Sequence, residues 1–187
     1  MDKIILASGS PRRKQLLEQA GYTFDVITTD VDETNPPGMA GELVPEFLAK
    51  KKAAAIEQLY PEAVIIAADT IVLLDGQILG KPRDAADAKA MLQSLSGKMH
   101  KVVTGVCVQK GTNQNCFSVV TEVYFRPLST TQVDHYIDHY KPFDKAGSYA
   151  IQEWIGLVGI EKINGDYYNV MGLPVGDVVI AIDAIRS

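Results

Sequence analysis

The pattern of apolar and polar positions predicts that the chain begins with a strand followed directly by a helix. A short apolar run at 4–7, within a predicted strand at 3–7, breaks into a polar turn, after which apolar residues recur at helical spacing over 10–20. Ser10 is a favoured N-cap residue, and Pro11 suits the first helical position because its missing N–H would lack a helical partner there. Gly21 can close the helix. A buried strand is therefore expected to deliver a polar turn to a helix start.

Strand and helix patterns then alternate without a strict order. The predicted strands lie at 64–68, 71–74, 101–109 and 116–125, and the later helices are expected to begin near Pro45, Asp84 and Ser129, with a closing helix up to Ile185. Asp75-Gly76 is a strong hairpin dipeptide. No linker or internal repeat divides the sequence, so one domain over 1–187 is expected. We predict an α/β fold with a mixed twisted sheet flanked by helices, rather than a doubly wound sheet.

The composition is that of a globular protein with a small excess of negative charge. The 187 residues are 47% hydrophobic, enough for one sizeable core or two small lobes that share one. A formal net charge of −5 argues against broad nucleic-acid binding but permits a local basic pocket for a small anion. No apolar stretch approaches the ~20 residues that span a bilayer, and a signal-peptide pattern is lacking. The expected location is the cytoplasm, without a membrane partner.

The two cysteines and two of the histidines are of residue types that often bind metals, but each pair has a simpler interpretation than a metal site. Cys107 and Cys116 each lie on an apolar-alternating segment, and a reducing compartment would leave both as free thiols, so we expect packing residues. His135 and His139 stand four apart on a predicted helix and share one face. No third ligand is evident nearby, and aspartates between them are typical of a solvated face, so a metal site is not expected there.

The turn from Ser8 to Arg13 has the layout of a phosphate site. The free N–H groups and the positive dipole end of a helix start attract anions. Arg12 and Arg13 add donors that can bind phosphate oxygens in a bidentate manner. A capped helix start with two solvated arginines accounts for the same residues without a ligand. The segment by itself leaves both interpretations open.

Carboxylates in two places are candidates for catalysis and metal binding. Asp69 follows the apolar run at 64–68, where desolvation is costly unless a cation, a metal or hydrogen bonds compensate. We therefore predict that Asp69 is a base or a metal ligand, the alternative being a turn cap formed with Thr70. In the acidic loop, Asp32 and Glu33 add oxygens of the kind that Mg²⁺ or Mn²⁺ prefers, with phosphate oxygens completing the shell.

Basic residues beside predicted strand ends, helix starts and glycine turns complete the candidate chemistry. Lys52, Lys81 and Lys145 join the two arginines at such places, where α/β folds gather ligand sites. The run 50–52 lies inside a helical pattern, so its three lysines cannot share one face. A Walker P-loop, GxGxxG, GxSxG and HExxH are all absent. These features favour a hydrolase that handles phosphoryl groups.

Six segments, taken together and in order, resemble a known family. They are Ser8-Gly9-Ser10-Pro11-Arg12-Arg13, Ala67-Ala68-Asp69-Thr70, Gly80-Lys81-Pro82, Thr104-Gly105-Val106, Lys145-Ala146-Gly147-Ser148-Tyr149-Ala150-Ile151-Gln152 and Gly172-Leu173-Pro174. They are similar to the signature segments of the Maf family of nucleoside triphosphate pyrophosphatases. The resemblance implies a fold akin to that of inosine triphosphate pyrophosphatases, with two lobes around a cleft. It also implies hydrolysis of a nucleotide to its monophosphate and pyrophosphate, a divalent cation (Mg²⁺, Mn²⁺ or Co²⁺) and a homodimer.

The resemblance also assigns roles by position. Asp69 matches the family's proton acceptor, and Arg13, Thr70 and Gln152 match positions associated with substrate choice. Combined with the chemistry above, the expected catalytic residues are Asp69, Glu33, Lys52 and Lys81, of which Glu33 and Asp69 would bind the metal. The expected substrate-binding residues are Ser8, Ser10, Arg12, Arg13, Thr70 and Gln152.

The segment around Gln152 is similar to the branch of the family that acts on dTTP and UTP, including modified pyrimidine nucleotides. The Gln152 amide offers a donor and an acceptor that could pair with the O4/N3–H edge of thymine or uracil, and Thr70 could supply a hydroxyl. Losing such a paired contact discriminates more strongly than losing a methylene group. Glu153-Trp154 departs from the glycine that many relatives in this branch carry after the glutamine, which raises the question whether Trp154 alters or covers the base pocket.

Three alternatives stay open at this point. The chain could belong to the branch that acts on 7-methyl-GTP, or it could be a nucleotide-binding regulator of septum formation, as the family's name implies. Sugar-phosphate or nucleotidyl transfer would need a second acceptor site that the sequence does not reveal. Removal of damaged nucleotides and control of division are both compatible with these residues.

Overall fold

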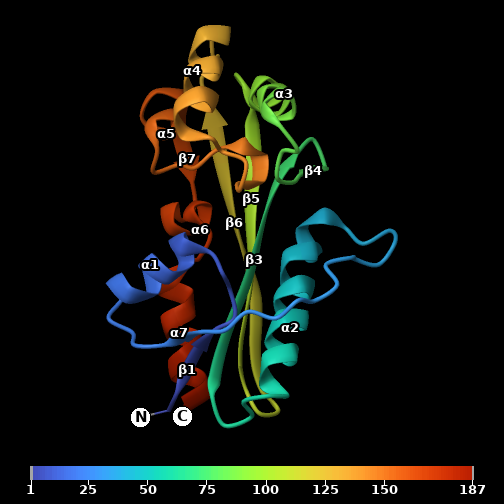
Figure 1. Ribbon diagram of the computed structural model, residues 1–187, viewed down its shortest axis with the longest axis vertical. Helices are drawn as coiled ribbons and strands as arrows, with labels where there is room; N and C mark the ends of the chain where they lie inside the picture. Colours follow the sequence, from blue (N-terminus) through green and yellow to red (C-terminus); the bar gives the residue numbers. More distant parts are fainter. Residues whose placement is uncertain (1, 187) are drawn as a thin grey trace. The chain divides into compact units, whose positions relative to one another are not determined.

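Strands and helices alternate through the whole of the computed structural model, which describes residues 2–186 (Figure 1). The strands are β1 (Ile4–Leu6), β2 (Asp25–Val26), β3 (Val64–Leu74), β4 (Gln77–Leu79), β5 (Met99–Lys110), β6 (Asn113–Phe125) and β7 (Ile160–Asn164). The α-helices are α1 (Pro11–Gln19), α2 (Val44–Glu57), α3 (Ala85–Leu95), α4 (Thr130–Tyr140), α5 (Trp154–Gly159), α6 (Tyr167–Met171) and α7 (Val175–Arg186). Two 3₁₀ turns are η1 (Gly41–Leu43) and η2 (Ala146–Ser148). None of these helices is long and apolar enough to cross a membrane.

The strands form a mixed sheet in the order β2-β1-β3-β5-β6-β7, with β4 paired to β3. β1 runs parallel to both β2 and β3, with Ile5 beside Asp25 on one side and beside Ile65 on the other. β4 is antiparallel to β3, and β7 is antiparallel to β6. The predicted mixed α/β fold is therefore confirmed, and the strand order is not that of a doubly wound sheet.

One strand boundary differs from the prediction at the position that matters most for chemistry. The two strands expected at 64–68 and 71–74 are a single strand, β3, which continues through Asp69 and Thr70. These two residues are the partly exposed ones in an otherwise buried strand. Polar residues need not end a strand whose backbone is paired with its neighbours. Asp69 therefore lies in the middle of a strand rather than at its end.

Local capping chemistry sets the helix starts largely as predicted. The Asp84 side chain accepts a hydrogen bond from the Asp87 N–H, and Ser129 forms a capping box with Gln132. Ser10 occupies the N-cap position of α1, but its side chain makes no capping hydrogen bond; its own N–H donates to Ser8 Oγ at 3.3 Å. The first turn of α1 is therefore organised by Ser8.

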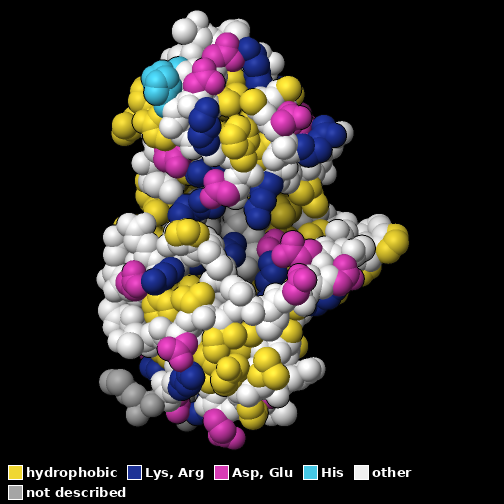
Figure 2. Space-filling view, in the orientation of Figure 1, with side chains coloured by type: hydrophobic (Ala, Val, Ile, Leu, Met, Phe, Trp, Pro, Cys, Tyr) yellow, Lys and Arg dark blue, Asp and Glu magenta, His cyan; other side chains and the backbone are white. Residues whose placement is uncertain are grey.

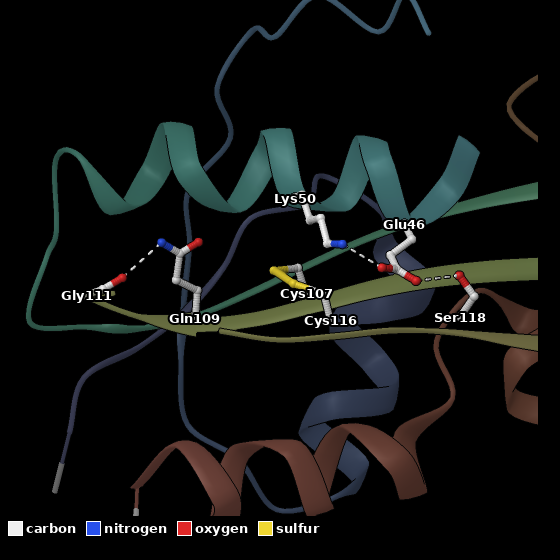
Figure 3. Close-up of a disulfide and its surroundings, with 7 residues drawn as sticks. All are labelled: Glu46, Lys50, Cys107, Gln109, Gly111, Cys116 and Ser118. Carbon is white, nitrogen blue, oxygen red and sulfur yellow. Dashed lines mark hydrogen bonds and ion pairs between the residues drawn. A yellow bond between two sulfur atoms is a disulfide. The ribbon is translucent and has the colours of Figure 1, made fainter. Parts of the chain in front are cut away.

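The described residues form two compact units, and β3, β5 and β6 contribute to both. The first unit contains the chain up to Asp69, Thr104–Val119 and the chain from Gly172 onward. Within it, α2 covers one face of the strands, and α1 and α7 lie on the other (Figures 1 and 3). Its core joins α2 to the sheet through Ala49, Ala53 and Ile56, which pack with Ile5, Ile65, Ala67 and Cys107.

A glycine on β5 lets α2 approach the sheet closely. A Cβ added to Gly105 would lie 2.0 Å from the Glu46 nitrogen and 2.2 Å from the Pro45 carbonyl carbon, both backbone atoms of the first turn of α2. No other residue fits this contact unless the helix moves. Gly105 therefore sets the position of α2.

The second unit contains Thr70–Val103 and Val120–Met171. Leu92 and Leu95 of α3, Val133 and Ile137 of α4 and Val123 of β6 belong to its buried core. The predicted hairpin turn between β3 and β4 is confirmed, because Asp75 and Gly76 both have positive φ angles, of 51° and 80°. On the face drawn in Figure 2, both units carry basic side chains interspersed with acidic ones.

The two cysteines are joined as a disulfide, which corrects the expectation of free thiols (Figure 3). Cys107 on β5 and Cys116 on β6 lie equally far from the Gly111-Thr112 turn, so the hairpin register places them opposite each other, with Cα atoms 4.1 Å apart. The expected compartment indicates whether thiols stay reduced, but it does not show which cysteines lie opposite each other in the fold. The expectation that they are packing residues is confirmed for Cys107, which is completely buried.

Candidate active site

Three charged side chains of the first unit converge on one point. Lys52 Nζ lies 2.7 Å from Asp69 Oδ1 and 2.8 Å from Glu33 Oε1. The Lys52 and Asp69 side chains are each 17% exposed, whereas that of Glu33 is 62% exposed. The largely buried carboxylate of Asp69 thus has the compensating cation that its burial requires.

The packing of α2 brings Lys52 to Asp69. Ala49, Ala53 and Ile56 form the buried face of the helix, which lies against the sheet that contains β3. As predicted, the three successive lysines point in different directions. Lys50 pairs with Glu46 and Lys51 with Asp32, at 2.7 and 3.6 Å, so only Lys52 reaches Asp69.

The Arg13 side chain, in the first turn of α1, donates hydrogen bonds to groups from three segments of the chain. Its Nη1 donates to Ser8 Oγ at 3.0 Å and to the Ala68 carbonyl at 2.8 Å, and its Nε donates to the Gly172 carbonyl at 2.7 Å. Burial lowers the pKa of the Arg13 guanidinium below its usual value, and the negative charge of Asp69 opposes this shift. Arg13 therefore joins the Ser8 turn, the residue before Asp69 and the Gly172 segment.

The remaining predicted site residues fall into three groups. Ser10 and Arg12, in the same first-unit turn as Arg13, are half-buried. Thr70 follows Asp69 on β3, within the second unit. Lys81 and Gln152, also in the second unit, are exposed.

Lys145 of the second unit is enclosed by carboxylates. It is buried, and its Nζ lies 2.8 Å from Asp144 Oδ1 and 3.5 Å from Glu153 Oε1. Its charge is thus matched within the protein. Trp154, which the sequence placed near a base pocket, packs against His135 with ring centroids 4.7 Å apart.

The two histidines of α4 lie side by side, and the expectation that they bind no metal stays a prediction. The His135 and His139 rings lie 4.2 Å apart, and His139 Nδ1 is 2.8 Å from the His135 carbonyl oxygen. Among the described residues, no group of three or more histidine, cysteine, aspartate or glutamate side chains is arranged to hold a metal.

Comparison with known proteins identifies the family. The family model described as "Maf-like protein" matches residues 3–185. The chain belongs to the Maf family. A Cytophaga hutchinsonii protein named dTTP/UTP pyrophosphatase is 52% identical over 176 residues, 94% of this Maf chain and 81% of that protein. A Bacteroides fragilis protein of the same name is 53% identical over 175 residues, 92% of this chain and 91% of its own. Among solved structures, the Staphylococcus aureus Ham1 protein is 15% identical, with a TM-score of 0.47 over 66% of this chain and 72% of that one.

The fit of a divalent cation to this Maf protein depends on where the carboxylate oxygens lie. Glu33 and Asp69 both direct an oxygen at the position of Lys52 Nζ, so their oxygens converge from two segments. Mg²⁺ commonly takes one or two protein carboxylates, with waters and substrate phosphate oxygens completing its shell. Glu33 and Asp69 supply the number of carboxylates that this pattern needs, but the point at which their oxygens meet is filled by the Lys52 ammonium group.

Sequence reasoning missed several contacts around Arg13 and in the core of the second unit. The Ala68 and Gly172 carbonyls that hold Arg13 are backbone groups and leave no trace in residue type. In the second unit, buried His100 Nε2 lies 2.7 Å from the Tyr149 hydroxyl, and the buried Tyr136 hydroxyl contacts Glu153. Buried tyrosines usually find a polar partner, but the sequence does not reveal which one.

Proposed function

We propose that this Maf protein is a pyrophosphatase that hydrolyses dTTP and UTP, together with modified pyrimidine nucleotides, to the nucleoside monophosphate and pyrophosphate. The observation that carries the proposal is the convergence of Asp69, Glu33 and Lys52 beside the Ser8 turn, to which Arg13 is hydrogen-bonded. The names of relatives that are about half identical over most of the chain support the choice of substrate.

In the proposed reaction, Asp69 takes a proton from the water that attacks the α-phosphorus. A bond forms between the water oxygen and this phosphorus, and the bond to the bridging oxygen breaks, so that pyrophosphate leaves. Lys52, 2.7 Å from Asp69, orients the carboxylate through a charge-assisted hydrogen bond. The choice of the α-phosphorus rests on the family resemblance.

Cations stabilise the charge that develops on the departing pyrophosphate. We assign this role to Arg12, Arg13, Lys52 and Lys81, whose guanidinium and ammonium groups suit phosphate oxygens. Glu33 and Asp69 would hold a divalent cation (Mg²⁺, Mn²⁺ or Co²⁺). When bound, such an ion neutralises phosphate charge and polarises the phosphorus. Ser8 and Ser10 would contact the phosphates, and Thr70 and Gln152 the base.

A nucleotide panel tests the proposal. Pyrophosphate release is measured with dTTP, UTP, dCTP and 7-methyl-GTP, each with Mg²⁺, Mn²⁺ and Co²⁺ and with chelator. We expect dTTP and UTP to be preferred and the chelator to abolish turnover. A preference for 7-methyl-GTP would contradict the substrate assignment, and nucleotide binding without turnover under every condition would favour a regulatory role. The homodimer and the cytoplasmic location stay predictions, which light scattering and cell fractionation test.

A further inference from the structure

Gln152 lies at the tip of a tight turn in the second unit. The Glu153 N–H donates to the Ala150 carbonyl at 3.1 Å, which leaves Ile151 and Gln152 as the two central residues. Ile151 is buried and Gln152 is exposed. Gln152 is therefore the side chain that the turn presents to solvent.

A single hydroxyl group contacts both ends of this turn. Tyr136 of α4 is completely buried, and its Oη accepts a hydrogen bond from the Ala150 N–H at 3.1 Å. The same Oη donates to Glu153 Oε2. The other oxygen of that carboxylate, Oε1, lies 3.5 Å from Lys145 Nζ. One phenol from helix α4 thus connects the first residue of the turn to the last.

The backbone around the turn is restricted further by α5. A Cβ on Gly156 would lie 1.7 Å from the Ile151 carbonyl oxygen, so α5 begins directly against the turn. The Gly156 N–H donates to the Glu153 carbonyl at 2.9 Å. With α5 on one side and Tyr136 at both ends, the turn has little freedom to move.

We propose that the Tyr136 hydroxyl, acting with the Glu153 carboxylate, is a positioning group that sets base discrimination by holding Gln152 in place. The inference rests on the proposed function, because it assumes that Gln152 reads the base. Thymine and uracil present an acceptor beside a donor, whereas cytosine presents the reverse pattern. A glutamine amide supplies both groups, so it discriminates only if its orientation is fixed and its position is held to within about half an ångström, and the turn sets the position from which the side chain starts. A looser turn lets the amide shift and pair with either base.

The test is the ratio of kcat/KM for dTTP to that for dCTP in Tyr136→Phe, which removes the hydroxyl and keeps the ring. We expect this ratio to fall about tenfold, through a higher KM for dTTP, while turnover of dCTP stays close to that of the parent. A purely structural role would lower turnover of both nucleotides equally. Tyr140→Phe is the matched control, because Tyr140 stacks on Tyr136 with its ring centroid 5.0 Å away and is exposed.

Variants of Glu153 make the test independent of the Tyr136 substitution. Glu153→Ala should reproduce the fall in the ratio, and Glu153→Gln, which keeps an acceptor oxygen, should restore most of it. The double variant Tyr136→Phe/Glu153→Ala should lose little more than either single variant, because each substitution already removes the hydrogen bond between Tyr136 and Glu153. Since the Glu153 side chain is 22% exposed, its variants decide the question if Tyr136→Phe does not fold.

Two results overturn the inference in distinguishable ways. An unchanged ratio in folded Tyr136→Phe or folded Glu153→Ala, with a parent that prefers dTTP, refutes the positioning role and leaves the proposed function intact. A parent that does not prefer dTTP or UTP over dCTP refutes the substrate assignment, and the role of Tyr136 falls with it.

Discussion

Replacing Gly105 by alanine should displace α2 and separate Lys52 from Asp69. The added Cβ would lie 2.0 Å from the Glu46 nitrogen, whereas ordinary contacts begin at 3.4 Å, so the helix must move by about 1.4 Å. Overpacking of this kind costs about 1–3 kcal/mol, and each kcal/mol lowers Tm by about 2–4 °C at this size. A displacement of about 1 Å at a catalytic contact lowers activity about 100-fold. We therefore expect both a lower Tm and a much lower kcat/KM for dTTP.

Thermal unfolding and pyrophosphate release, measured on the same samples, check this prediction. Gly176→Ala is the matched control, because a Cβ there meets nothing within 4 Å and the residue lies in helix α7 of the same unit. Alanine at such a helical position should leave Tm unchanged or raise it slightly. If Gly105→Ala keeps the Tm and activity of the parent, the close approach of α2 does not position Lys52.

Three further predictions follow from single contacts. Asp69→Asn should keep the fold and lower pyrophosphate release about 10²–10⁴-fold, as loss of a general base does; full release with Mg²⁺ would refute the assignment. Arg13→Lys cannot replace the three hydrogen bonds of the guanidinium, so the free energy of unfolding, measured by urea denaturation, should fall by about 2–4 kcal/mol. An unchanged free energy of unfolding would show that these hydrogen bonds do not stabilise the fold. Burial lowers the pKa of His100 from 6.5 to about 4, so the unfolded state binds the proton more readily than the folded state. Up to about 3 kcal/mol of the free energy of unfolding should therefore be lost as pH falls from 6.5 through 4. Urea unfolding at a series of pH values measures this loss, and His100→Gln should lack it.

The features that the sequence predicted correctly depend on neighbouring residues. The caps at Asp84 and Ser129 and the Asp75-Gly76 turn each need only a few adjacent residues to form. Asp69 was harder to place. The run of apolar residues suggested that a strand ends there, but pairing with neighbouring strands, which the local pattern does not show, carries β3 through it.

The candidate site, like the fold, could be predicted from the sequence only in part. Residue types predicted a mixture of carboxylates and cations, because phosphate and metal chemistry needs both. The pairing of Lys52 with Asp69 depends on the distance between α2 and the sheet, which Gly105 sets. Thr104-Gly105-Val106 stood out only as part of a resemblance, and the physical reason for its glycine became visible with the helix lying on it.

The turn that carries Gln152 depends on a tertiary contact that the local sequence does not show. Its tip, Gln152, was assigned from the family resemblance, and the donor and acceptor of its amide suit base recognition. The group that holds the tip could not be predicted, because Tyr136 looks like any core aromatic residue on a helix with apolar spacing. Its hydroxyl has a purpose only when Ala150 and Glu153 are brought against it by α4 and α5. Glu153 gives that hydroxyl its acceptor. A glycine at this position would leave Tyr136 only the backbone contact, so we expect Glu153→Gly to reduce the dTTP-to-dCTP ratio as Glu153→Ala does, and retention of the parent ratio would show that the backbone contact alone holds the turn.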